Sequence, residues 1–175
     1  MSLSQPRYRV IPPSAYTPEI GSFVAMLEHC RESVLDSVKD LTVAQLDHQQ
    51  DDKANPIGAL LAHMAAIEWF YVVASFEGVQ PQPHDWGEWS VFLRLTPATW
   101  AAAKGQSIEN HVERLARIRV RALAALEKRD DAWLSGTFSL PWTQELANHR
   151  WALYHLLEDE LNHRGQIRWL KGRLP

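Results

Sequence analysis

A run of apolar residues near the middle of the chain, PIGALLAHMAAIEWFYVVASF from Pro56 to Phe76, constrains the fold more than any other feature. Its length would allow it to span a lipid bilayer, but His63 and Glu68 lie well inside it, and ionisable side chains are costly in lipid. A segment that is apolar on most sides and stays out of the membrane must be covered by protein. We therefore expect the central helix of a helical bundle.

Three further segments carry apolar residues at steps of three and four positions, the spacing of a helix with one buried face. They cover residues 17–41, 107–128 and 148–171. Thr17 and Asn55 each precede a proline, and Ser107 precedes the third helix, so all three are N-cap candidates. Because no segment shows a convincing strand pattern, the sequence predicts an all-α four-helix bundle that forms a single domain over residues 1–175.

Long connections lie between the second and third helices and between the third and fourth. Residues 79–105 are rich in proline and aromatic residues, and residues 130–146 contain Gly136 and Pro141. Connections of this length are usually functional loops or lids. We expect the first one to supply an apolar substrate pocket, and short strands within either connection are a possible addition to the bundle.

The composition narrows the classes of function. Of the 175 residues, 46% are hydrophobic and 22% are charged, which is ordinary for a globular domain with one core. The net charge of −3 provides no broad positive field, which argues against nucleic acid as a partner. Cys30 falls on the buried stripe of the first helix, so we expect a small core residue and not a reactive thiol. The start MSLSQPRYRV lacks the apolar region of a signal peptide, which favours a cytoplasmic protein.

The last predicted helix carries a polar cluster, EDELNHRGQI over residues 158–167, on the face that should point inward. On a helical wheel centred on His163, Asp159 lies one turn earlier and Gln166 follows, with apolar residues on both sides. A charge in such a position is costly unless it is paired or bound to a metal ion. Since residues four positions apart can bind one ion together, Asp159 and His163 are candidate metal ligands.

His63 is the candidate third ligand, because it lies in the middle of the apolar stripe of the second helix. A lone buried histidine is more often an ordinary core residue, but a second histidine and an aspartate favour a metal site. Glu160, Gln166 and His155 are candidates for orienting a ligand ring or a bound water. For Glu160, an ion pair or hydrogen bond to Arg119, Arg164 or a loop amide is an equal alternative. Arg119 could bind an acidic group in a site, but we expect it at the edge of its stripe with the guanidinium group in solvent.

The segment HLLEDELNHRGQI resembles the C-terminal signature of the DinB-like (DinB/YfiT) superfamily of four-helix bundles, which has a Glu-His-Glu stretch followed by His-Arg-Gly-Gln and an aliphatic residue. The matching positions are Glu158, Asp159, Glu160, His163, Arg164, Gly165, Gln166 and Ile167. The segment NPIGALLAHMAAIEW resembles the second helix of that superfamily, whose histidine corresponds to His63. The order of helices and loops agrees over most of the chain.

The resemblance implies a divalent metal ion, usually zinc or nickel, held by the three side chains that correspond to His63, Asp159 and His163. Asp159 departs from the superfamily, which usually has histidine there. A carboxylate is a competent zinc ligand, and two histidines with one carboxylate also suit iron(II), manganese or nickel. The same substitution is compatible with a relative that has lost its metal.

Activities known in the superfamily include S-transfer with a low-molecular-weight bacterial thiol and a maleylpyruvate isomerisation. The resemblance therefore implies a metal-dependent enzyme that acts on a small molecule and uses such a thiol as cosubstrate. Metal-dependent hydrolysis is one alternative, and a non-catalytic helical protein of stress response or interaction is another. Relatives are often dimers, and Tyr154, Leu157 and Leu161 give the last helix a second apolar face, so we expect a homodimer.

Overall fold

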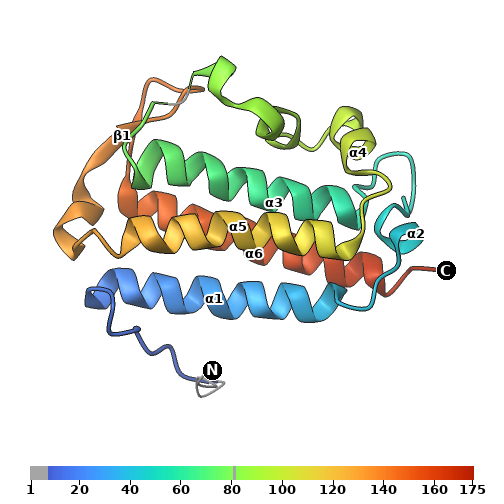
Figure 1. Ribbon diagram of the computed structural model, residues 1–175, viewed down its shortest axis with the longest axis horizontal. Coiled ribbons are helices and arrows are strands. Elements are labelled where there is room, and N and C mark those ends of the chain that lie inside the picture. Colours follow the sequence, from blue (N-terminus) through green and yellow to red (C-terminus); the bar gives the residue numbers. More distant parts are fainter. Residues whose placement is uncertain (1–7, 81) are drawn as a thin grey trace.

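The computed structural model describes residues 8–80 and 82–175. Four long helices lie side by side along the molecule in Figure 1: α1 (Pro18–Val38), α3 (Ile57–Tyr71), α5 (Ile108–Leu126) and α6 (His149–Lys171). The prediction of an all-α four-helix bundle is confirmed. A small antiparallel sheet is added before α6, where β1 (Thr137–Ser139) pairs with β2 (Leu146–Asn148).

Helix α3 is the central helix of the bundle. All its residues except Ile67 are buried, and the chain continues into a buried π-helix, η1 (Val72–Phe76). By length and composition alone, Ile57–Phe76 is apolar enough to cross a membrane, but 94% of its most apolar stretch is buried inside the protein. The apolar run is therefore explained by the bundle core.

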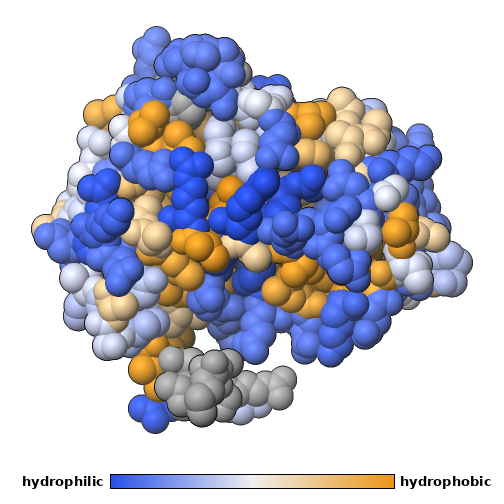
Figure 2. Space-filling view, viewed as in Figure 1, coloured by the Kyte–Doolittle hydropathy of each residue, from blue (hydrophilic) through white to orange (hydrophobic). Residues whose placement is uncertain are grey.

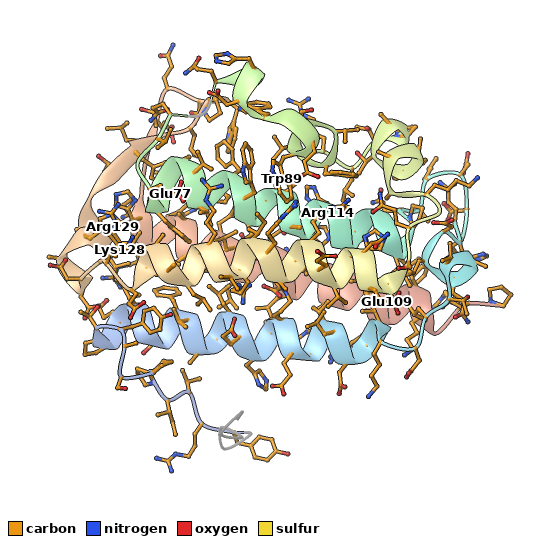
Figure 3. The ribbon with its side chains drawn as sticks, in the orientation of Figure 1. Glu77, Trp89, Glu109, Arg114, Lys128 and Arg129 are labelled. Atoms are coloured by element: carbon orange, nitrogen blue, oxygen red, sulfur yellow. The ribbon has the colours of Figure 1, made fainter. Side chains whose placement is uncertain are left out.

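The connection from α3 to α5 covers one side of α3 (Figure 1), and we call residues 77–80 and 82–107 the covering segment. It contains two 3-10 helices and one α-helix: η2 (Pro83–Asp85), η3 (Gly87–Phe92) and α4 (Pro97–Ala103). Trp89 lies between this segment and α3 (Figure 3) and stacks on Trp69 with ring centroids 5.8 Å apart. Arg117 of α5 pairs with Glu88 at 2.7 Å. The covering segment is thus fixed to both α3 and α5. On the face shown in Figure 2, the surface over α1 and α5 consists of hydrophilic side chains with apolar patches between them.

The predicted cap at Ser107 is confirmed, Asn148 is a further cap, and the cap at Thr17 is replaced by a distant residue. Ser107 and Asn148 each accept a hydrogen bond from the backbone N–H group three residues later. Thr17 instead donates its hydroxyl to the carboxylate of Asp131 at 2.5 Å, and that carboxylate also accepts from backbone N–H groups in the first turn of α1. Asp131 begins the 3-10 helix η4 (Asp131–Ser135), so the cap comes from the connection between α5 and α6.

The prediction that Asn55 caps α3 is wrong. Its side-chain oxygen accepts a hydrogen bond from the indole N–H of Trp100 in α4 at 2.7 Å, and α3 begins after Pro56 without a side-chain cap. Either partner satisfies the carboxamide oxygen, so the choice depends on where the covering segment lies. In the connection between α1 and α3, the short helix α2 (Val43–Leu46) starts with a capping box between Thr42 and Gln45.

One charged side chain from each long helix meets in the bundle core, and we call this group the ion network: Arg31 of α1, Glu68 of α3, Arg119 of α5 and Glu160 of α6. Arg31 contacts Glu68 at 2.9 Å and Glu160 at 2.6 Å. Arg119 contacts the same two carboxylates at 2.5 and 3.0 Å, and it also reaches Glu28 at 2.7 Å. All four members of the network are buried. The prediction that Arg119 extends into solvent is wrong, because two buried carboxylates hold it in the core.

The charges of the ion network compensate one another. Burial by itself would raise the pKa of Glu68, but the guanidinium groups of Arg119 and Arg31 outweigh it and lower the pKa. Removing one partner from such a buried network leaves a charge without compensation, which costs about 3–5 kcal/mol. Because every long helix contributes one member, the network opposes any sliding of one helix along another.

We predict that Glu68→Gln lowers the free energy of unfolding by about 3 kcal/mol or more, since two buried guanidinium groups lose a counter-charge. The matched control is Glu88→Gln, whose carboxylate forms an ion pair with Arg117 that is more than half exposed. The control should cost less than about 1 kcal/mol. Urea unfolding of both variants measures the difference, and equal losses would contradict a structural role for the network.

His111, in the first turn of α5, is buried with neither ring nitrogen hydrogen-bonded within the described residues. It packs against the start of α3, where a Cβ added at Gly58 would lie 3.1 Å from its Nε2 atom. Burial, together with the charge of Arg114, lowers the pKa of His111 from 6.5 to about 4. The folded protein therefore keeps this ring neutral well below the pH at which the unfolded chain protonates it.

Stability should consequently fall as the pH drops from 6.5 toward 4, where the unfolded chain binds a proton at His111 and the folded chain does not. This residue alone accounts for a loss of about 3 kcal/mol over that range. In His111→Leu the pH dependence of unfolding should be reduced by that amount, whereas His84→Leu, at an exposed position, should leave it unchanged. Chemical unfolding at several pH values tests this, and identical slopes in the two variants would refute it.

Candidate metal centre

Helices α3 and α6 bring His63, Asp159 and His163 together between them. The Oδ1 atom of Asp159 lies 3.2 Å from Nε2 of His163 and 3.9 Å from Nε2 of His63. The two imidazole rings are perpendicular, with centroids 5.1 Å apart. One ligand atom from each residue lies within 4.8 Å of the other two, a spacing that a single ion with bonds of about 2.0–2.2 Å would bridge after small side-chain movements.

Both histidines are oriented by a hydrogen bond at the nitrogen that faces away from Asp159. The Nδ1 atom of His63 lies 2.7 Å from the backbone carbonyl oxygen of Phe92, which can only accept, so Nδ1 carries the proton. The Nδ1 atom of His163 similarly lies 3.3 Å from Oε1 of Gln166. In the neutral form of each ring, Nε2 therefore carries the lone pair on the side of Asp159, as metal-binding histidines require.

The charge of Asp159 affects the pKa values of both histidines. Burial lowers the pKa of His63, and the charge of Asp159 only partly opposes it. Burial acts on His163 in the same direction, but there the hydrogen bond and the charge of Asp159 outweigh it and raise the pKa. A proton on His163 thus competes with a cation for the same pair of atoms, so binding of a metal ion would release that proton.

The residues expected to orient the ligands behave differently from one another. Gln166 contacts His163, whereas Glu160 lies in the ion network and its carboxylate is paired with two arginines. His155 stacks on Trp151 with ring centroids 4.8 Å apart, and its Nδ1 atom lies 3.1 Å from the carboxylate of Glu158. The carboxylate of Glu158 and the indole of Trp151 therefore fix the His155 ring.

Aromatic side chains gather on the Asp159 side of the centre. Tyr71, two turns after His63 on α3, is buried, and its ring contacts His155 at 5.5 Å. Burial raises the pKa of Tyr71, and the negative charge of Asp159 raises it further, so the hydroxyl keeps its proton. Beyond it, Trp142 packs on Phe70 at 5.0 Å and stays 61% exposed. This side offers an apolar surface close to the most exposed ligand.

Three contributors were not identified from the sequence. The carbonyl of Phe92 has no side-chain signal, and Tyr71 gives only its spacing of eight residues from His63. Arg31 has the same helical spacing as Leu27 and Val34, so the sequence signal for it was a charged residue on a buried stripe.

A cavity of about 10 Å³, the size of one water molecule, lies between the ion network and the candidate metal centre. It is lined by Arg31, Met64, Glu68, Arg119, Leu156, Asp159 and Glu160.

Cys30 takes no part in this chemistry. Its thiol is buried, and burial, with the negative charge of Glu160, raises its pKa to about 11. A thiol with such a pKa is a poor nucleophile at neutral pH. The prediction that Cys30 is a core residue is confirmed.

Comparisons with known proteins identify the family. No curated protein matches the chain. Two solved structures share its fold: the conserved protein of a locus from Enterococcus faecalis, with a TM-score of 0.69, 15% identity and coverage of 87% of this chain and 94% of the other, and YfiT from Bacillus subtilis, with a TM-score of 0.68, 18% identity and coverage of 93% and 92%. YfiT is described as a probable metal-dependent hydrolase with an unusual four-helix bundle topology. The family model for mycothiol-S-transferase matches residues 22–174. The resemblance to the DinB/YfiT superfamily is thereby confirmed, and the chain belongs to the mycothiol-S-transferase family.

Proposed function

We propose that the protein is a divalent-metal-dependent enzyme that transfers a low-molecular-weight bacterial thiol to a small electrophile. The observation that carries the proposal is the convergence of two Nε2 atoms and one carboxylate oxygen from His63, His163 and Asp159. Hydrogen bonds at both Nδ1 atoms support it, because they favour the tautomer in which Nε2 can bind a metal ion. The family match supports the choice of thiol transfer.

The two imidazoles and the carboxylate limit which metal ions the site can bind. Two imidazoles and a carboxylate are accepted by zinc and nickel, which the resemblance favours, and also by manganese and iron(II). Asp159 replaces the usual histidine of the superfamily, so the bound ion keeps one positive charge fewer than it would among three neutral ligands. When bound, the ion would hold the thiol as a thiolate near neutral pH and so supply the nucleophile.

The protein's own groups would prepare the site for this reaction. The carbonyl of Phe92 and the side chain of Gln166 hold the two imidazole rings in place. The aromatic surface around Tyr71 and Trp151 would exclude water and receive the apolar part of the electrophile. Since the Tyr71 hydroxyl keeps its proton, it is suited to donate a hydrogen bond to an oxygen of that substrate.

Metal-dependent hydrolysis is the second candidate, and the shared fold with YfiT favours it. The same three ligands would serve a hydrolase, in which the metal lowers the pKa of a bound water.

We also propose that the protein is cytoplasmic and forms a homodimer. The outer face of α6 is suited to a second subunit, since Tyr154 and Leu161 are 49% and 41% exposed.

The metal part of the proposal predicts that the full-length protein, purified without chelators, carries about one divalent ion per chain. His63→Ala should remove the ion, because only the two ligands from α6 would remain. The bundle itself should stay folded. The exposed His84→Ala serves as the matched control and should keep the ion. Elemental analysis combined with circular dichroism measures both. A folded wild-type protein that holds no metal and takes up neither zinc, nickel, manganese nor iron(II) would rule out the metal and favour a non-catalytic bundle.

The choice between transfer and hydrolysis predicts different kinetics. With a panel of electrophiles and bacterial thiols, turnover should depend on the thiol concentration and should be lost in His163→Ala, because the thiolate would lose its site. The same protein should be tested with esters and amides in the absence of thiol. Turnover that is indifferent to thiol but still lost in His163→Ala would point to hydrolysis instead.

A further inference from the structure

A groove of about 430 Å³ lies beside the candidate metal centre and is lined by residues of the connection before α3 and of the C-terminal half of α6. We call it the α6 groove; its lining residues are Lys53, Ala54, Asn55, Gly165, Gln166, Trp169 and Leu170. This volume lies within the usual range for small-molecule sites, about 300–1,000 Å³. These seven residues include no carboxylate.

The side chains that line the α6 groove offer hydrogen-bond donors. The Oδ1 atom of Asn55 is occupied by the indole N–H of Trp100, which leaves the NH₂ group of Asn55 available. The Oε1 atom of Gln166 faces Nδ1 of His163, which leaves its NH₂ group available in the same way. Lys53 adds an exposed ammonium group. Two amides whose acceptor atoms are engaged and one cation together favour a ligand that is negatively charged and accepts hydrogen bonds.

The remaining lining is apolar and open. Trp169 is 50% exposed, and the guanidinium group of Arg173 lies 3.9 Å from the centroid of its ring. A Cβ added at Gly165 would meet no atom within 4 Å, so this glycine leaves space in the groove that a side chain would fill. A flat or aliphatic group could therefore lie over Trp169 and Leu170 while an acidic group meets the donors.

We propose that the α6 groove binds a small organic carboxylate. Its carboxylate would accept hydrogen bonds from Lys53, Asn55 and Gln166, and its apolar part would cover the Trp169 ring. Binding in the groove does not depend on a metal ion, because none of the lining residues is a candidate ligand.

Gln166 links this groove to the metal centre, and this second part of the inference rests on the proposed function. A carboxylate that accepts from the NH₂ group of Gln166 polarises the amide and makes Oε1 a stronger acceptor for the Nδ1 proton of His163. The His163 ring would then be held more firmly with Nε2 toward the other ligands. Since coupling between two sites is reciprocal, carboxylate and metal should each raise the affinity for the other.

The groove is tested on metal-free protein with benzoate, and with the neutral benzamide as the matched probe. Benzoate should shift the side-chain amide resonances of Asn55 and Gln166 saturably, and benzamide should bind at least about tenfold more weakly. Lys53→Met, which removes the charge, and Gly165→Leu, which fills the groove, should each weaken benzoate by about tenfold or more. Lys104→Met is the control for loss of a lysine elsewhere on the surface. Equal binding of the two probes, or no effect of Lys53→Met, would overturn the proposal.

The coupling is tested by zinc titration of the wild type with and without saturating benzoate, corrected for zinc bound by benzoate itself. Zinc should bind about fivefold more tightly, or better, with benzoate present. In Gln166→Ala the difference should vanish while benzoate still binds through Lys53 and Asn55. Equal zinc affinities in the wild type would overturn the coupling. A protein that binds benzoate but takes up no metal would overturn the metal-dependent function together with the coupling, and the carboxylate site would stand.

Discussion

Four buried charges set the geometry on which the rest of the molecule depends. Glu68 lies five residues after His63 on α3, and Glu160 follows Asp159 directly on α6. A slip of α6 along α3 by one turn, about 5.4 Å, would separate both the ion pairs and the three candidate ligands. The network and the metal centre therefore require the same register of the two helices. An apolar core tolerates many small shifts, whereas buried charges lose their partners when helices slide, so the network favours one register of the helices.

The covering segment completes the centre from outside the bundle. Its residue Phe92 supplies the carbonyl that orients His63, and the guanidinium group of Arg114 lies 5.0 Å from the Phe92 ring. Arg121 adds an ion pair with Glu77 at 2.6 Å. Arg114 and Arg121 of α5, whose spacing alone suggests solvated surface residues, thus hold the covering segment against α3. Among the three candidate ligands, Asp159 keeps the most exposed side chain, at 16%, so the candidate centre is most open to solvent on the side of that carboxylate.

The family match and the shared fold support the bundle. The resemblance to the superfamily implies histidine at the position of Asp159, which is the candidate ligand that solvent reaches most easily. An aspartate there carries a formal charge and has a second oxygen, which a histidine lacks. The same helix continues into Gln166, whose carboxamide has one end at His163 and the other available to the α6 groove. One turn of α6 therefore serves both the candidate metal centre and the groove, and a change at Gln166 would affect both.

The amino-acid sequence by itself determined the helices and the identity of the candidate ligands. Apolar spacing marked the four long helices, and the i, i+4 spacing of Asp159 and His163 placed them on one face, because both patterns are local consequences of helical geometry. Only the tertiary structure decided which partners the polar groups chose. Arg119 reaches carboxylates from three other helices, Asn55 bonds Trp100 in place of its own helix, and His63 bonds a backbone carbonyl. Such partners are distant in the chain, and a polar atom accepts any neighbour that satisfies it, so their selection depends on how the helices and the covering segment pack together.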